Sequence, residues 1–157
     1  MPAIPHTAKV WTEKFNELCM ESSKMGETND CTVKAICVVT GATYADVHAR
    51  MAAKGRQRRK GAFQWDTHAV IRELGFTCTR VKKEEMEAKY DIKKTGGYIY
   101  KQLTTHHLAV YPEAWKDGHA YIIHTSRHVS GAVDGTLHDW AIGRAKRIQS
   151  IYRIEKA

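Results

Sequence analysis

A thiol, an imidazole and a carboxylate, the three groups of a thiol-based catalyst, are supplied by Cys31, His128 and Asp139. The residues around Cys31 predict that it lies in the first turn of a helix, with Asn29 or Asp30 as the capping residue. The N–H groups at a helix start lack partners within the helix and form the positive end of its dipole, so they favour a thiolate. The neighbouring charge of Asp30 opposes ionisation. Cys31 is therefore the candidate nucleophile.

The spacing of His128 and Asp139 predicts that they meet across a β-hairpin. Asp134-Gly135 is a strong signal for a two-residue turn, which fixes the register of the two flanking strands. In that register Ser130 lies opposite Asp139, and His128 is a diagonal neighbour on the same face. A carboxylate beside an imidazole fixes its tautomer and stabilises the imidazolium, which leaves the second ring nitrogen for a thiol.

These residues also have purely structural interpretations. His128 on an apolar strand could be a core histidine with satisfied hydrogen bonds, and Asp139 could accept a backbone hydrogen bond at a strand end. Trp65 and Trp140 are most simply core residues or the walls of a groove. The pairing with Cys31 favours the catalytic interpretation.

Two runs of sequence resemble papain-like cysteine peptidases of phage and bacterial proteins. NDCTVKAICVVTGATYADVH is similar to the nucleophile helix of that family, which an Asn-Asp-Cys turn opens and a Gly-x-x-Tyr break follows. IIHTSRHVSGAVDGTLHDW is similar to the end of the family, where a strand histidine precedes an Asp-Gly hairpin and a His-Asp pair. The basic segment 55–61 matches a recurring insert. The order and spacing of the motifs carry the resemblance.

The resemblance implies a fold and a set of roles. The fold would be papain-like, with N-terminal helices and a central nucleophile helix packed on a C-terminal antiparallel sheet. Cys31 would be the nucleophile, His128 the base and Asp139 the orienting acid. Met25 stands where papain has its oxyanion glutamine. The turn before the cysteine could instead supply backbone N–H groups, as in OTU-type deubiquitinating peptidases, and Asn29 could add its side-chain amide.

The implied activity is that of a cysteine peptidase or isopeptidase with a protein or peptide substrate and no cofactor. His128 would take the proton of Cys31, the thiolate would attack a carbonyl carbon, and water would release the acyl group. Acyl transfer of transglutaminase type would use the same residues. The runner-up interpretation is a papain-like scaffold that acts only by binding, because a fold does not fix a function, and acyl transfer is the third.

The distribution of elements along the 157 residues predicts one α+β domain over 1–157, with helices first and antiparallel strands afterwards. The expected helices cover residues 8–24, 30–40, 44–53, 66–74 and 83–90, with Thr43 capping the third and a further turn starting at Thr104 or Thr105. The expected strands cover 76–82, 119–125, 127–133, 136–140 and 146–154.

A basic stretch over residues 54–61 contributes to the net charge of +8. Its charged members are Lys54, Arg56, Arg58, Arg59 and Lys60. Such a cluster could contact nucleic acid or an acidic host protein, with steep salt dependence if phosphates are bound. The alternative is a solvated basic loop. No aromatic residues interleave with the run, so it does not predict a platform for stacking bases.

The remaining cysteines and histidines predict no metal site. None of the four cysteines forms a CxxC pair, and six of the nine histidines fall within residues 106–138 without a recognisable zinc pattern. The sequence has no apolar run of about 18 residues and no leader pattern, so neither a membrane span nor a secretory signal is expected. A cytoplasmic location with free thiols follows, in the host cytoplasm if a phage encodes the protein.

Overall fold

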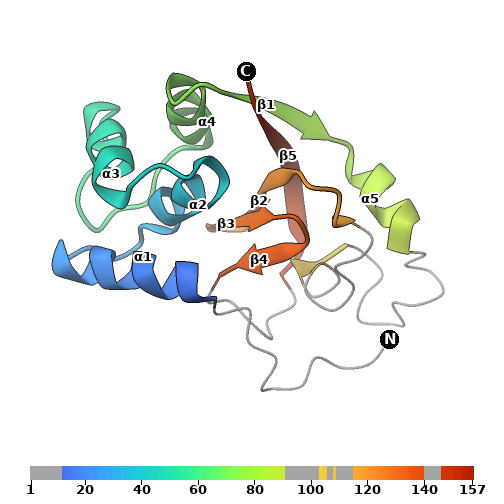
Figure 1. Ribbon diagram of the computed structural model, residues 1–157, viewed down its shortest axis with the longest axis horizontal. Helices are drawn as coiled ribbons and strands as arrows, with labels where there is room; N and C mark the ends of the chain where they lie inside the picture. The colour runs from blue at the N-terminus through green and yellow to red at the C-terminus, as the bar shows by residue number, and fades with distance from the viewer. Residues whose placement is uncertain (1–11, 91–102, 106–107, 109–114, 140–145) are drawn as a thin grey trace.

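The computed structural model describes residues 12–90, 103–105, 108, 115–139 and 146–157. In these segments the chain forms five helices and a five-stranded antiparallel sheet (Figure 1). The helices are α1 (Glu13–Lys24), α2 (Cys31–Thr40), α3 (Tyr44–Ala53), α4 (Gln64–Glu73) and α5 (Lys83–Tyr90). The strands are β1 (Phe76–Val81), β2 (Ala120–Thr125), β3 (His128–Val133), β4 (Thr136–His138) and β5 (Ile148–Lys156), in the order β1-β5-β2-β3-β4. The predicted α+β class is confirmed.

Helices α1 to α4 lie together on one side of the sheet, with α2 innermost (Figure 1). Alternate residues of β2 point to opposite faces, as a strand requires. Ile122 therefore packs with Ile36 and the other helical side chains, whereas Ile123 packs on the opposite face with Met86 of α5 and Trp115. The sheet is thus buried on both faces, and α2 is held in the middle of the molecule.

Helix α2 is apolar around most of its circumference because it is enclosed by both helices and sheet. Seven of its ten residues are buried, which is the pattern of an internal helix. It ends at Gly41, whose φ of 75° is left-handed and whose N–H donates to the carbonyl of Cys37 at 3.0 Å. The expected central helix with a glycine stop is confirmed.

The closest approach of α2 to the sheet occurs at Gly131 of β3. A Cβ added there would lie 2.8 Å from the carbonyl oxygen of Ala35 and 2.8 Å from the Cβ of Val38. Real Cβ atoms do not approach other atoms so closely, so only glycine permits this separation of helix and strand. The contact sets the distance between the N-terminal end of α2 and the start of β3.

The predicted β3–β4 hairpin is confirmed. Gly131 pairs with His138 in the expected register. Asp134 and Gly135 both have positive φ, 45° and 80°, which is the conformation of a type I′ turn. Strand β4 ends at His138, earlier than expected, so Asp139 follows the strand directly.

The other elements agree with the sequence to within a few residues. Thr43 caps α3 by accepting a hydrogen bond from the N–H of Asp46, as predicted. Helix α4 begins two residues earlier than expected, at Gln64. Strand β5 extends two residues further because it pairs with both β1 and β2. The expected start of the first helix at residue 8 and most of the turn after Thr104 lie outside the described residues.

The described segments contain four cysteines, all of them free thiols. Among the helices that the structure describes, none combines the length and apolar character that a membrane crossing requires.

Replacing Gly131 with Ala should destabilise the protein by about 1–3 kcal/mol, the usual range for an added methyl in a packed core. The new Cβ meets a backbone carbonyl, so α2 must shift. Urea unfolding measures the effect. Gly61→Ala is the control, because its Cβ would meet nothing within 4 Å. Equal stability of the two variants would contradict the close contact.

Candidate active site

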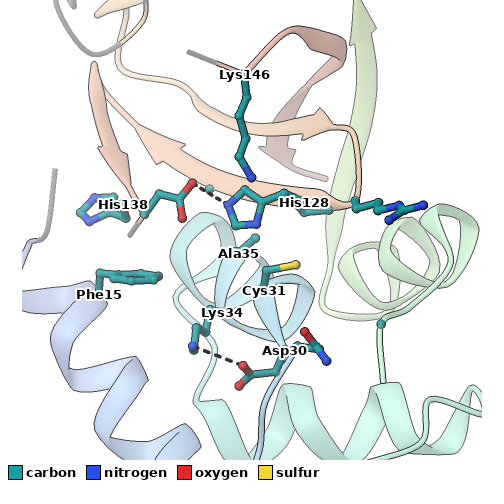
Figure 2. A pocket seen from close by; sticks show the side chains of 14 residues that line it. Phe15, Asp30, Cys31, Lys34, Ala35, His128, His138 and Lys146 are labelled. Atoms are coloured by element: carbon teal, nitrogen blue, oxygen red, sulfur yellow. Dashed lines mark hydrogen bonds and ion pairs between the residues drawn. The ribbon is translucent and has the colours of Figure 1, made fainter. Parts of the chain in front are cut away.

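The three residues expected to form a catalytic group come together at one end of α2 (Figure 2). Cys31 is the first residue of α2, His128 the first residue of β3, and Asp139 follows β4. The Nε2 atom of His128 lies 2.7 Å from Oδ2 of Asp139, and both residues are more than nine-tenths buried. The diagonal contact predicted across the hairpin is therefore present.

Asp139 is held from a second side by Ser130. The buried hydroxyl of Ser130 donates a hydrogen bond to the same Oδ2 that contacts His128. The hairpin register placed Ser130 opposite Asp139, but the sequence alone did not give it a role. Its hydrogen bond fixes the carboxylate, which in turn fixes the orientation of the imidazole.

The thiol of Cys31 and the imidazole of His128 stabilise each other's charged forms. Burial raises the pKa of Cys31, but the hydrogen bond and charge of His128, with the N–H of Val129 and the hydroxyl of Thr32, bring it below its usual range. Burial lowers the pKa of His128, but Asp139 and Cys31 raise it to about 9. The imidazolium of His128 and the thiolate of Cys31 therefore favour each other, and each shifts the pKa of its partner toward the charged form.

The surroundings of the other three cysteines oppose ionisation of the thiol. Burial raises the pKa of Cys19 and Cys78, and raises that of Cys37 to about 12. These thiols remain protonated at neutral pH and act as small apolar side chains. Cys31 is thus the one cysteine of the four whose surroundings favour the nucleophilic form.

The carboxylate of Asp30 is directed away from the thiol that it precedes. It accepts hydrogen bonds from the hydroxyls of Ser22 and Tyr44, both at 2.6 Å, and lies 3.2 Å from Nζ of Lys34. Figure 2 shows this carboxylate and the sulfur of Cys31 on different sides of the helix start. The expected capping role is wrong for the side chain of Asp30, because it makes no hydrogen bond to the first turn of α2.

Asn29 has a left-handed backbone, with φ of 53°, and likewise does not cap α2. Its side-chain nitrogen donates to the carbonyl of Arg59 at 3.2 Å, and the residue lines the cavity beside Cys31. An amide nitrogen carries two hydrogens, so the second can still be donated. The side chain of the N-cap residue Asp30 makes no cap hydrogen bond, so the N–H groups of the first turn of α2 are candidate donors to a ligand.

The turn before Cys31 is built around a buried carboxylate, Glu27, that the sequence did not single out. Nη1 of Arg56 and Nε2 of His48 lie 2.7 Å and 2.5 Å from Oε2 of Glu27, and the N–H of Arg59 donates to Oε1 at 2.8 Å. Burial raises the pKa of this carboxyl, but those three donors lower it to about 2. Glu27 therefore remains charged and ties the turn to the basic stretch.

Most charged side chains of the basic stretch contact protein groups, although all but Arg56 are also solvent-exposed. The side chain of Arg56 is only 3% exposed, so this residue is not available to a partner. Arg58 and Arg59 donate to the carbonyls of Met25 and Gly26. Lys54 lies 2.6 Å from the carboxylate of Glu73. The fifth residue, Lys60, lines a shallow cavity next to the loop. The loop thus clamps the turn that precedes the nucleophile.

Two adjoining cavities open on either side of Cys31 and His128. The first, about 350 Å³, is called the Lys34 cavity (Figure 2), and the second, about 410 Å³, the Phe63 cavity. Both are lined by Cys31, Gly61, Arg127, His128 and Val129. The Lys34 cavity adds Phe15, Lys34, His138, Asp139 and Lys146, and the Phe63 cavity adds Phe63, Gln64, Thr67, His124 and Gln149. The thiol lies where an extended chain could cross from one cavity to the other.

Two histidines, His68 and His124, contact each other at the Phe63 cavity, which His124 lines. The Nε2 atoms of His68 and His124 are 3.1 Å apart, and Tyr152 packs against both rings. Burial lowers both pKa values, that of His124 to about 4, so the pair is neutral. The described residues contain no group of three or more His, Cys, Asp or Glu side chains placed to hold a metal ion.

Comparisons with protein-family models, curated proteins and solved structures found no match to this chain. The function therefore has to be argued from the chemistry of the site. The site provides a cysteine whose pKa is lowered by a neighbouring histidine, a carboxylate that contacts this histidine, and a cavity lined by all three residues. Such a group can attack an electrophilic carbon.

Iodoacetamide at neutral pH should alkylate Cys31 before the other three cysteines, because only its pKa is lowered. Peptide mapping by mass spectrometry measures each rate. Solvent access also differs among the four thiols, so the decisive comparison is the alkylation rate of Cys31 in the unmodified protein with its rate in His128→Gln. There the rate should fall by about tenfold or more, as the thiol returns toward the free-cysteine pKa of about 8.5. An unchanged rate would contradict the ion pair.

Replacing Glu27 with Gln should cost about 3 kcal/mol of unfolding free energy, because Arg56 is left buried without its counter-charge. The stabilisation is complete above the ordinary carboxyl pKa of 4.5 and is lost as pH falls toward 2, since the folded pKa is lowered. Urea unfolding at several pH values measures the difference from the unmodified protein.

The matched control is Glu73→Gln, which removes a half-exposed carboxylate that pairs with Lys54. An exposed pair of this kind contributes about 1 kcal/mol or less. Equal losses in the two variants, or a Glu27→Gln effect that does not shrink on acidification, would contradict the buried clamp.

Proposed function

We propose that this protein is a papain-like cysteine peptidase or isopeptidase of phage or bacterial type. The observation that carries the proposal is the arrangement of His128 between Cys31 and Asp139, with the pKa of the thiol lowered and that of the imidazole raised. A core histidine would require neither the buried carboxylate nor the hydrogen bond to a cysteine. The arrangement is the one that a thiol nucleophile needs.

The fold supports the same proposal. The candidate nucleophile opens an internal helix, and that helix packs directly on the strand that carries the candidate base. The order along the chain is cysteine, histidine, carboxylate, with the latter two on one hairpin. Both features support the proposal of a papain-like domain.

In the proposed reaction the thiolate of Cys31 attacks the carbonyl carbon of a peptide or isopeptide bond. The imidazolium of His128 gives its proton to the leaving amine, and an acyl-enzyme remains. His128 then takes a proton from water, which attacks the thioester and releases the acid. Asp139 holds the imidazole throughout, and Ser130 holds Asp139. N–H groups at the start of α2 and the amide of Asn29 are the candidate oxyanion donors.

The location and partners that accompany this proposal remain predictions: a cytoplasmic protein with a protein or peptide substrate and no cofactor. Binding of nucleic acid or an acidic protein through the basic stretch is a weaker alternative. Four of its five charged side chains are held by protein groups, Arg56 almost fully buried among them.

The test is cleavage of a proteome-derived peptide library, read by mass spectrometry. Cys31→Ala should abolish cleavage, and Cys19→Ala, the matched thiol control, should retain it. Asp139→Asn should lower the rate about tenfold or more by releasing the imidazole. Cleavage should also decline above a pH of about 9, where His128 loses the proton that the leaving amine requires.

Full cleavage by Cys31→Ala would refute the proposal. Adding a primary amine separates hydrolysis from acyl transfer, because transfer yields the amide of that amine instead of the free acid.

A further inference from the structure

Phe63 and Trp65 form the most exposed aromatic surface of the described residues. Their side chains are 62% and 67% exposed, and their rings stack at 4.5 Å with an interplanar angle of 6°. The sequence predicts Trp65 to be a core residue or a groove wall, and it is not in the core. Two large apolar rings in water are unfavourable unless a ligand covers them, so this stack indicates a binding surface.

The stack is continuous with the candidate active site. Phe63 lines the Phe63 cavity together with Cys31 and His128. Gly61 and Ala62, which precede Phe63 in the chain, line the same cavity. Both are small, so they do not separate Phe63 from Cys31. A chain lying over Cys31 can therefore place a side chain against the face of Phe63, with Trp65 stacked beside it.

The charges around the groove favour a peptide with acidic residues. The exposed Arg127 lines both cavities, and Lys60 lies with Phe63 at the edge of the basic stretch. Each arginine of that stretch donates to the turn over residues 25–28, Arg56 from a buried position and Arg58 and Arg59 from exposed ones. An acidic peptide needs only the cations that border the groove.

We propose that the Phe63–Trp65 stack is the specificity surface of the site, and that it binds a large apolar or aromatic side chain of an acidic peptide substrate near the scissile bond. This inference rests on the proposed peptidase function. Aromatic side chains gain both apolar burial and offset stacking on such a surface, whereas alanine gains neither. An exposed stack bordered by cations thus selects for side-chain size and for charge.

Peptide binding to the Cys31→Ala protein tests this surface without turnover. The probes are fluorescein-labelled nonapeptides with a central Phe or Ala that is flanked by Glu or by Lys. Each is named by its central and flanking residues, as in the Phe–Glu peptide, and binding is measured by fluorescence anisotropy. The Phe–Glu peptide should bind at least about tenfold more tightly than its Ala counterpart, the ratio expected for burial of one aromatic side chain. It should also bind more tightly than the Phe–Lys peptide.

The preference for Phe should disappear in Trp65→Ala and in the double variant Phe63→Ala/Trp65→Ala. Neither residue's side chain caps α4, so these changes leave the helix start intact. Met20→Ala is the matched control, since Met20 is 54% exposed but lines neither cavity beside Cys31. It should keep the preference. The Phe–Glu peptide should also slow alkylation of Cys31 by iodoacetamide in the unmodified protein.

Equal binding of the Phe and Ala peptides, or a preference that survives Trp65→Ala, would overturn the proposal. A second result would also overturn it: a single-stranded oligonucleotide binds, its binding is lost in Trp65→Ala, and the peptides bind equally. That result would assign the stack to nucleic acid. These outcomes leave the alkylation of Cys31 without peptide unchanged. A Cys31 that does not react refutes the peptidase instead, so the two failures are distinguishable.

Discussion

At Gly131 the backbone of β3 lies directly against α2, because a glycine leaves room there for the carbonyl of Ala35 and the side chain of Val38. This contact sets the separation between a helix that begins with Cys31 and a strand that begins with His128. A larger residue would move the two apart, and the hydrogen bond that adjusts both pKa values depends on their proximity. The lowered pKa of the thiol therefore depends on how closely the two elements pack.

Three carboxylates lie near the candidate nucleophile Cys31, and each has different partners. Asp139 accepts hydrogen bonds from His128 and Ser130, so its charge supports an imidazolium and, through it, a thiolate. Asp30 adjoins Cys31 in the sequence, but its charge is shared with two hydroxyls and Lys34 on the other side of the helix start. Glu27, four residues before Cys31 in the sequence, remains charged and is paired with Arg56 of the basic stretch. Negative charge thus surrounds the site without opposing ionisation of the thiol.

The hairpin could be predicted because its signal is local. Asp134-Gly135 specifies the turn, and strand alternation then places His128 beside Asp139 without further information. The clamp on the preceding turn could not be predicted, because Glu27 and Arg56 are 29 positions apart and both lie in polar sequence that favours solvent exposure. Periodicity identifies apolar faces and carries no signal for a buried ion pair. Of the two predictions for Trp65, a core residue or a groove wall, the core position is wrong, because this tryptophan is 67% exposed although aromatic residues are usually buried.

The central claim is that His128 lowers the pKa of Cys31 and so favours its thiolate. The most direct measurement is the ultraviolet absorbance of the thiolate during a pH titration, taken as the difference between the unmodified protein and Cys31→Ser. The difference isolates one thiol among four. The account predicts a midpoint clearly below the free-cysteine pKa of about 8.5. A midpoint at or above that value would show that the ion pair does not form, and would contradict the account.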